Sequence, residues 1–376
     1  MRIVHVSVAY RPPVFQSQRG GAIQRRIAET AREQARRGHE VVVYSPGEER
    51  RTIVVDDVTV HYLPCRASYP LRHLEFIARA MSHVRRGFDV IHGHSEPELG
   101  VLARAAQVPA VMQYDNYFFR GGPGSRIAPA VRRAWLSWDR LLPCSEYCAD
   151  ASSAAWSLPR ERVSVVPNGV NTEQFSPAAG DGARNDRNGR APRLLYVGRV
   201  CRQKGTDVLL DALPLIRESA PDAELVVGGP IGQFDRSDFA DEESEEAWRA
   251  RFEAARVDYR GPVDEDELVP LMRSADVFVM PTRELEMFGM AAVEAAACGT
   301  PVVASDHGGL RETVPLDAGG RFRNEDPADL AANVTRLISG ETDLAAVGRR
   351  ARADAERYAW PVVVDRIEEI YAEIGR

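Results

Sequence analysis

Short apolar runs of strand length recur along the whole chain and alternate with helical stretches. The runs lie at Ile3–Val8, Val41–Tyr44, Val90–His92, Ala110–Met112, Leu194–Val197, Leu225–Val227, Val277–Met280 and Val302–Ala304. Runs of this kind are typical of parallel strands that are buried on both faces. Their alternation with helices predicts an α/β class of doubly wound sheets, which bind ligands at the carboxyl ends of the strands. Because the pattern is present on both sides of residue 180, we expect two such sheets.

A polar segment at residues 176–192 separates the two groups of runs. It is rich in glycine and proline and has no hydrophobic periodicity, so we predict an interdomain linker. The flanking segments, 1–175 and 193–361, are then two domains with one doubly wound sheet each. A chain of 376 residues is long enough for each domain to bury a core. An amphipathic helix is predicted from Trp360 to Tyr371.

Composition excludes several classes of protein. Hydrophobic residues make up 44% and charged residues 27% of the chain, which is typical of soluble globular proteins. No apolar stretch reaches the roughly 18 residues of a membrane span, and the apolar start at residues 1–8 is too short for a signal peptide. No basic block with interleaved aromatics indicates nucleic-acid binding. The five cysteines lack zinc-ligand spacing, so we expect reduced thiols, no metal and a cytoplasmic protein.

The first candidate site surrounds Lys204, the only lysine of the chain. Lys204 and Arg199 lie in the turn Gly198-Arg-Val-Cys-Arg-Gln-Lys-Gly205, between an apolar run and a helical pattern that begins at Asp207. A compact ammonium suits a phosphate oxygen, and a turn that opens a helix offers free amides and the positive end of a dipole. A lone lysine is as often a solvated loop residue. The complete turn favours a phosphate site.

The second candidate site contains two glutamates, Glu286 and Glu294, in Glu-Met-Phe-Gly-Met-Ala-Ala-Val-Glu. The helical pattern begins near Ala291, so Glu294 lies in the first turns of a helix and Glu286 in the preceding loop. A carboxylate there accepts hydrogen bonds from sugar hydroxyls, and the amides from Phe288 to Met290 can face an anion. A lone glutamate is usually solvated, whereas this framed pair predicts a segment that binds a sugar and its diphosphate.

Both motifs, together with others in the same order, resemble those of glycosyltransferase family 4. The others include Arg19-Gly-Gly-Ala-Ile-Gln, Asp89-Val-Ile-His-Gly-His, Val165-Val-Pro-Asn-Gly-Val-Asn and Ser305-Asp-His-Gly-Gly-Leu-Arg-Glu. The resemblance covers nearly the whole chain. It implies the GT-B architecture of two facing Rossmann-like domains with an interdomain cleft, and a retaining, metal-independent sugar transfer. It also implies that the last helix, at 362–376, packs back on the first domain.

The resemblance further implies roles for single residues. Arg199 and Lys204 would hold the donor diphosphate, Glu294 the ribose hydroxyls and Glu286 the transferred sugar. The other donor-binding positions would be Gly20, Gly21, Gly198, Arg260, Phe288, Gly289, Met290 and Ala291. His94 completes the expected catalytic set, and His92 and Asp115 are expected on the acceptor side.

Two positions depart from the family pattern and bear on specificity. Met287 replaces the proline or glycine that many relatives carry, which would alter the sugar pocket. Asp115 stands where many carry a histidine, and its charge favours a small polar, amine-bearing acceptor. Residues 1–180 hold 23 basic against 17 acidic side chains, which favours an anionic or lipid-linked saccharide instead. Charges near 4 Å outweigh a rim screened over about 8–10 Å, so we give Asp115 more weight.

The arginines of that rim are expected around the cleft. They are Arg11, Arg19, Arg25, Arg120, Arg126, Arg132 and Arg133.

Two weaker signals remain open at this point. His92 and His94 alternate at the end of a predicted strand and point to one face, which fits core residues as well as a substrate contact. Residues 126–140 form a basic segment with Trp135 and Trp138. Such a segment could meet an anionic membrane surface, or be an ordinary helix with its tryptophans in the core.

The sequence thus predicts an enzyme that moves a sugar from a nucleoside diphosphate sugar to an acceptor hydroxyl. A sugar-nucleotide epimerase on the same fold and a non-catalytic sugar-nucleotide-binding protein are the alternatives. The expected partners are a nucleoside diphosphate sugar and a small polar or lipid-linked saccharide, with no cofactor, no metal and no nucleic acid. A peripheral contact at the inner membrane face stays open.

Overall fold

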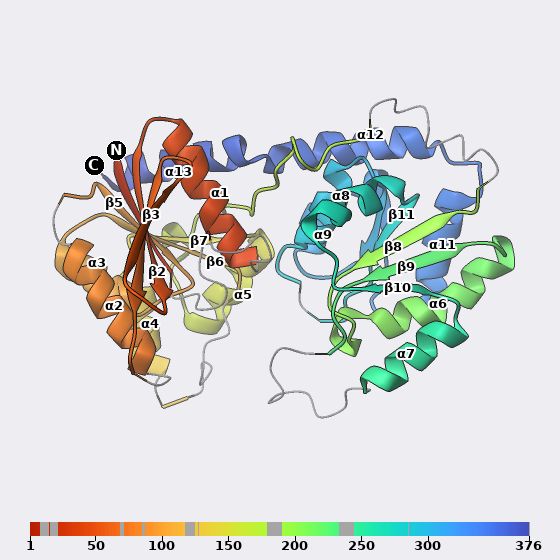
Figure 1. Ribbon diagram of the computed structural model, residues 1–376, viewed down its shortest axis with the longest axis horizontal. Coiled ribbons are helices and arrows are strands. Elements are labelled where there is room, and N and C mark those ends of the chain that lie inside the picture. Colours follow the sequence, from red (N-terminus) through yellow and green to blue (C-terminus); the bar gives the residue numbers. More distant parts are fainter. Residues whose placement is uncertain are drawn as a thin grey trace. The chain divides into compact units, whose positions relative to one another are not determined.

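The computed structural model describes residues 1–7, 15, 22–67, 71–84, 87–116, 125–126, 128–178, 190–232, 244–284 and 286–375. The chain divides into two units, Met1–Gly169 with Trp360–Arg376, and Val170–Ala359. Figure 1 shows that each unit has its own sheet with helices packed against it. The predicted fold class, two parallel-sheet α/β domains, is confirmed.

In the first unit the described strands form a seven-stranded sheet in the order β3-β4-β2-β1-β5-β6-β7. Neighbouring strands are parallel except β3 and β4, which are antiparallel. The strands are β1 (Arg2–Val6), β2 (Glu40–Gly47), β3 (Arg51–Val55), β4 (Val58–Pro64), β5 (Val90–His94), β6 (Ala110–Tyr114) and β7 (Arg140–Pro143). The helices are α1 (Ala22–Arg36), α2 (Leu71–Val84), α3 (Leu99–Ala106), α4 (Ala128–Trp135), α5 (Glu146–Trp156) and α13 (Trp360–Ile374).

In the second unit the described strands form a six-stranded, fully parallel sheet in the order β10-β9-β8-β11-β12-β13. The strands are β8 (Arg193–Val197), β9 (Glu224–Gly228), β10 (Asp258–Gly261), β11 (Val277–Met280), β12 (Val302–Ser305) and β13 (Gly319–Phe322). The helices are α6 (Thr206–Ser219), α7 (Glu245–Ala254), α8 (Glu265–Ser274), α9 (Met290–Ala297), α10 (Leu310–Thr313), α11 (Pro327–Ile338) and α12 (Leu344–Ala355).

The starts of several helices follow from local side-chain chemistry. The Ser145 hydroxyl accepts a hydrogen bond from the Cys148 amide at 3.0 Å and caps α5. The Asp326 carboxylate accepts one from the Asp329 amide at 3.0 Å, directly before Pro327 at the first position of α11. Both caps satisfy amides that a helix leaves without partners, and proline suits a position whose amide needs none.

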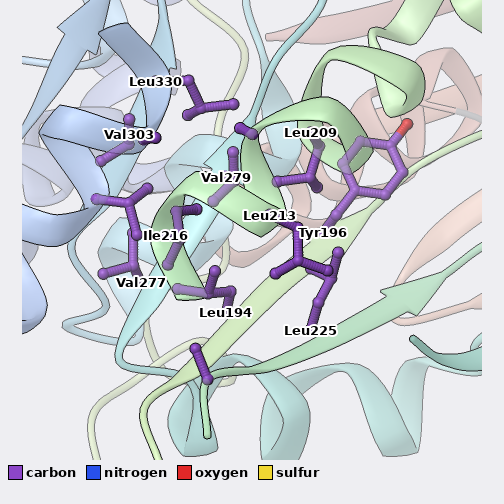
Figure 2. Packing of buried hydrophobic residues seen from close by; sticks show 14 of the residues in the cluster. Leu194, Tyr196, Leu209, Leu213, Ile216, Leu225, Val277, Val279, Val303 and Leu330 are labelled. Carbon is purple, nitrogen blue, oxygen red and sulfur yellow. The ribbon is translucent and has the colours of Figure 1, made fainter. Parts of the chain in front are cut away.

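The core of the second unit lies between its sheet and helices α6 and α11. Figure 2 shows Leu194, Leu225 and Val277 of the sheet packed against α6. From α6, Leu209, Leu213 and Ile216 enter this cluster, and each is fully buried. These side chains come from the apolar strand runs and from one face of an amphipathic helix, so the core keeps the strand ends rigid.

The last helix, α13, belongs to the first unit. Its buried side chains Trp360, Val363, Ile367, Ile370 and Tyr371 share one cluster with Ile3, Val90, Val111 and Leu142 of the sheet. Gly169 allows the approach of Trp360, because a Cβ at Gly169 would lie 2.3 Å from the indole ring. Arg37 adds polar contacts by donating to the Pro361 carbonyl at 2.7 Å and to Asp365 at 2.6 Å.

The first unit ends at Gly169, earlier than the predicted boundary at residue 175. Arg352 of α12 donates to the carbonyls of Thr172 at 3.0 Å and Phe175 at 2.7 Å, and Arg273 of α8 donates to that of Ser176 at 2.6 Å. These bonds join the segment after Gly169 to the second unit. Most of the predicted linker, residues 179–189, lies outside the described residues.

No helix among the described residues is long and apolar enough to cross a membrane.

Candidate active site

The carboxyl ends of β8 and β11 meet around Gly205 in the second unit. The chain leaves β8, turns through Arg202–Lys204 and enters α6 at Gly205, whose φ is +69°. A Cβ at Gly205 would lie 1.7 Å from the Pro281 carbonyl oxygen, which directly follows β11. Only glycine combines this left-handed backbone with so close an approach, and the contact brings the Lys204 turn beside the loop 281–289.

Lys204 and Glu286 form an ion pair across these two loops. The Lys204 Nζ donates to the Glu286 Oε2 at 2.6 Å, and the side chains are 28% and 18% exposed. Arg199 is half-buried in the same turn, with its guanidinium 3.5 Å from the Gln203 amide oxygen. The buried Tyr196 hydroxyl donates to the Arg199 carbonyl at 2.5 Å and fixes the backbone there. The structure therefore brings three predicted catalytic residues to one edge of the sheet.

Backbone hydrogen bonds hold the loop 281–289 on both sides of Glu286. The Arg283 amide donates to the Gln203 carbonyl at 3.1 Å, and the Gly309 amide donates to the Glu286 carbonyl at 2.8 Å. The Thr313 hydroxyl donates to the Phe288 carbonyl at 2.8 Å. These bonds fix the backbone of Glu286. Its carboxylate is held by a side-chain contact, the one to Lys204.

Helix α9 begins at the end of this loop, as the sequence predicts. Gly289 stands at its start with φ +90° and, as a glycine, provides no side-chain cap for the first amides. Met290 and Ala291 are half-buried there, so their amides and the positive helix end can face an anion. Phe288 is buried against the edge of Tyr358, with ring centroids 5.3 Å apart. Met287 is also buried.

Glu294 lies one turn into α9 and is only 3% exposed.

Of the remaining predicted donor positions, Gly198 begins the Lys204 turn, Arg260 lies on another strand, and two glycines lie outside the described residues. Gly198 extends β8, since its amide donates to the Gly228 carbonyl at 2.9 Å. Arg260 is exposed on the edge strand β10, where its guanidinium donates to Asp258 at 2.7 and 2.9 Å. The next residue, Gly261, lies at the carboxyl end of the neighbouring strand β9, where its carbonyl accepts a hydrogen bond from the Gly229 amide at 2.6 Å. Gly20 and Gly21 lie outside the described residues.

In the first unit, His92 and His94 form a buried stack with His5. The rings of His92 and His94 lie 4.4 Å apart and nearly parallel, at 9°. His5 Nδ1 is 3.0 Å from His94 Nε2 and His5 Nε2 is 2.7 Å from the Gln34 amide oxygen, while His92 Nδ1 is 2.6 Å from the Tyr371 hydroxyl. The two histidines share a face, as predicted, but all three rings are at most 1% exposed.

Burial keeps these three imidazoles neutral. It lowers the pKa of His5 to about 4, and it lowers the pKa of His92 and His94 well below the ordinary value. One nitrogen from each ring lies within 4.8 Å of the others, a spacing at which a metal ion could bind. Near-parallel rings do not direct their lone pairs to one point, and the His5–His94 hydrogen bond uses two of the nitrogens.

Asp115 is paired with a buried arginine, which alters the expectation drawn from its charge. Its Oδ1 accepts from the Arg26 guanidinium and, at 2.9 Å, from the Asn168 amide. Arg26 is 2% exposed and Asp115 19%. Because the arginine neutralises the carboxylate at contact distance, Asp115 does not present the net negative charge from which an amine-bearing acceptor was inferred.

For the basic segment 126–140 the structure selects one of the two predicted alternatives. Trp135 and Trp138 are both fully buried, so the tryptophans face the core rather than a membrane. Arg132 donates to the carbonyls of Trp156 and Ser157, each at 3.0 Å, where α5 ends. Helix α5 follows β7 and runs back along the sheet, so this end lies at the amino edge of the strands, opposite to the edge that binds ligands.

Arg132 and Arg133 line a cavity of about 900 Å³ at that place and do not belong to the rim expected around the cleft. Three other members of that rim, Arg11, Arg19 and Arg120, lie outside the described residues.

Sequence reasoning missed His5, Arg26 and Glu96. His5 pairs with His92 in the register between β1 and β5, so a parallel neighbour could have been inferred from strand order. No pattern in the sequence near Arg26 indicates its role, because its partner Asp115 lies far along the chain. Glu96 follows Ser95, which has φ +59°, beyond the end of β5. Burial raises the pKa of Glu96 to about 7.

Comparisons with known proteins match both halves of the chain. The family described as Glycosyltransferase Family 4 matches residues 20–174, and the family described as Glycosyl transferases group 1 matches residues 191–340. A D-inositol 3-phosphate glycosyltransferase of Catenulispora acidiphila is 32% identical, over 93% of this chain and 90% of that protein. One from Streptomyces bingchenggensis is 36% identical over 63% of this chain, but the match spans only 53% of that protein. Glycogen synthase of Mycobacterium tuberculosis is 30% identical, over 100% of this chain and 95% of that protein.

Solved structures share the fold at low sequence identity. A glycosyltransferase from Rickettsia africae has a TM-score of 0.77 and 17% identity, with 99% of this chain and 98% of that chain covered. An Anabaena protein, solved in complex with UDP and glucose, has a TM-score of 0.75 and 18% identity, with 99% of both chains covered.

Proposed function

The chain belongs to glycosyltransferase family 4, and on that premise we propose that it transfers a sugar from a nucleoside diphosphate sugar to an acceptor hydroxyl, with retention of configuration and without a metal ion. The observation that carries the proposal is the cluster at the carboxyl edge of the second sheet. There, Lys204 and Arg199 supply positive charge, and the open start of α9 supplies amides. Glu286 lies 2.6 Å from Lys204, which fits one ligand with a sugar next to a phosphate.

The chemistry follows from where charge develops. The bond from the anomeric carbon to the diphosphate oxygen breaks, and the leaving diphosphate gains negative charge. Lys204, Arg199 and the first amides of α9 are fixed in place before the reaction and stabilise that charge, which is the task a metal ion performs in other transferases.

The acceptor oxygen attacks on the face that the diphosphate leaves, and its proton passes to the leaving phosphate oxygen. Glu286 is assigned to bind the sugar hydroxyls rather than to attack the anomeric carbon. Glu294 is assigned to the ribose hydroxyls.

The acceptor we propose is a small polar molecule with hydroxyl groups. Relatives are named for D-inositol 3-phosphate and for glycogen, so both a cyclitol phosphate and a glucan occur among similar proteins. The Arg26–Asp115 pair is close to neutral, so it does not favour an amine-bearing acceptor. A lipid-linked saccharide is the competing acceptor.

A donor assay tests the proposal against its alternatives. The purified protein is incubated with UDP-, ADP- and GDP-sugars, and release of the diphosphate is measured with and without D-inositol 3-phosphate or a glucan. A transferase releases diphosphate slowly when no acceptor is present and faster when its acceptor is added. The anomeric coupling constant of the product then shows whether the configuration is retained. Interconversion of the donor without diphosphate release would instead indicate an epimerase, and binding without turnover a non-catalytic protein.

Metal removal tests the electrostatic part of the mechanism. With excess EDTA the transfer rate should stay within twofold of the untreated rate, because Lys204 and Arg199 provide the positive charge. Complete loss of activity, restored by a divalent ion, would contradict this. The variant His5→Gln would then show whether the buried histidine cluster holds the ion.

A further inference from the structure

The only lysine of the chain has an ionic partner within the protein itself. The Lys204 ammonium contacts the Glu286 carboxylate at 2.6 Å, and the Lys204 side chain is 28% exposed. A diphosphate that binds Lys204 must therefore displace this carboxylate or share the ammonium with it. Glu286 and the diphosphate carry the same sign of charge, so sharing is unfavourable at such short range.

The loop geometry lets Glu286 leave without moving the backbone. The Gly309 amide holds the Glu286 carbonyl, and the Arg283 and Phe288 positions are fixed by their own bonds to Gln203 and Thr313. Only the side chain has to rotate, which is a fast change of rotamer rather than a movement of the loop. A ligand with sugar hydroxyls gives the released carboxylate new hydrogen bonds, whereas a diphosphate without a sugar gives it none.

We infer that Glu286 alternates between Lys204 and the sugar, and that this exchange makes the site discriminate against the sugar-free nucleoside diphosphate. The inference rests on the proposed function, because it needs a diphosphate at Lys204 and a sugar at Glu286. With the whole donor bound, Glu286 moves to the sugar and Lys204 is free for the phosphate. After transfer the sugar is gone, so Glu286 returns to compete for Lys204 and weakens the hold on the leaving product.

The structure predicts opposite shifts for two ligands in one variant. In Glu286→Gln the neutral amide competes less for Lys204, so the nucleoside diphosphate should bind at least about threefold tighter. The nucleoside diphosphate sugar loses a charged hydrogen-bond acceptor and should bind about tenfold weaker or worse. A variant that merely damages the site would weaken both ligands, so opposite signs distinguish exchange from misfolding.

Isothermal titration measures both dissociation constants for the pairs UDP and UDP-glucose, ADP and ADP-glucose, and GDP and GDP-mannose. The matched control is Glu284→Gln, which removes the same charge two positions away on the same loop, where the partner is the Gln203 amide rather than the lysine. The control should leave both constants within twofold of wild type. If the dissociation constant of the nucleoside diphosphate fell equally in both variants, the inference would be overturned, because a general loss of negative charge would then be the cause.

A second measurement reads the ion pair without any nucleotide. Since Lys204 is the only ε-amine, acetylation with an N-hydroxysuccinimide ester modifies one side chain, and the α-amino group serves as an internal reference. Acetylation of Lys204 should be at least about threefold faster in Glu286→Gln than in wild type or Glu284→Gln. Equal rates, or a diphosphate that binds Glu286→Gln no tighter than wild type, overturn the exchange. A wild-type protein that binds none of the six nucleotides contradicts the proposed function itself.

Discussion

Replacing Gly205 by alanine should separate backbone strain from steric overlap at the start of α6. Gly205 has φ +69°, and its added Cβ would lie 1.7 Å from the Pro281 carbonyl oxygen. Gly261 is a matched control in the same unit, because its φ is +68° and no described atom lies within 4 Å of an added Cβ. Both substitutions force alanine into the left-handed region, but only Gly205→Ala adds an overlap.

The expected magnitudes follow from these two terms. The left-handed conformation costs an alanine ~1–2 kcal/mol, and the stiffer unfolded chain returns ~0.4–1 kcal/mol, so Gly261→Ala should lose about 1 kcal/mol of unfolding free energy. Overlap with fixed backbone adds ~1–3 kcal/mol for Gly205→Ala. For a unit of this size each kcal/mol lowers Tm by roughly 2–4 °C.

Scanning calorimetry of the whole protein measures the Tm of the second unit in both variants. Because relief of the overlap displaces Pro281 and with it the loop that carries Glu286, UDP-glucose affinity should fall in Gly205→Ala and stay near wild type in Gly261→Ala. Equal Tm losses in the two variants, with unchanged affinity, would show that the approach of Gly205 to Pro281 does not constrain this site.

Three further predictions concern charge. Lys204→Ala and Arg199→Ala should each lower kcat by about 10²–10³-fold, with urea unfolding curves close to wild type, because each removes one fixed donor from the leaving diphosphate; more than half of wild-type activity in either would contradict the assignment. Between pH 6.5 and 4 the unfolded chain binds a proton at His5 that the folded chain excludes, so folding stability is lost as pH falls through this window. His5→Gln should therefore reduce the acid-induced loss of unfolding free energy by roughly 3 kcal/mol, and an unchanged pH slope would argue against a neutral buried ring. Asp115→Asn should cost roughly 2 kcal/mol in chemical denaturation, because Arg26, only 2% exposed, keeps its charge and loses its ionic partner; a loss below 0.5 kcal/mol, within the usual range of surface substitutions, would mean that the pair contributes little.

The buried strands were predictable because their signal is local. Seven of the eight apolar runs lie wholly within strands of the two sheets, and the first, Ile3–Val8, overlaps β1 over Ile3–Val6 while Val8 lies outside the described residues. Five strands, β3, β4, β7, β10 and β13, lie outside these runs. Two of them have weak patterns: β10 is Asp-Tyr-Arg-Gly on a sheet edge, with alternating exposure, and β13 opens with two glycines. Such segments become strands through pairing with a neighbour rather than through their own composition.

The candidate site was predictable in its residues but not in its pairings. The motifs indicated that Lys204 and Glu286 serve one ligand, yet nothing in the spacing showed that they contact one another. The partner of Asp115 was invisible for the same reason, since Arg26 approaches it from a helix far away in the sequence. The expectation drawn from the charge of Asp115 could therefore not include its pairing with Arg26. Of the two alternatives for residues 126–140, packing selects the one that places Trp135 and Trp138 in the core.

The position of α13 fixes an order of assembly on the ribosome. The first sheet is synthesised early, but the side chains that cover Ile3, Val90, Val111 and Leu142 emerge only after Trp360. The second unit, Val170–Ala359, lies wholly between and has all its residues before then. The half of the protein that is made first must therefore be completed last, and a nascent chain that has not yet reached α13 exposes an apolar sheet face to chaperones and to aggregation.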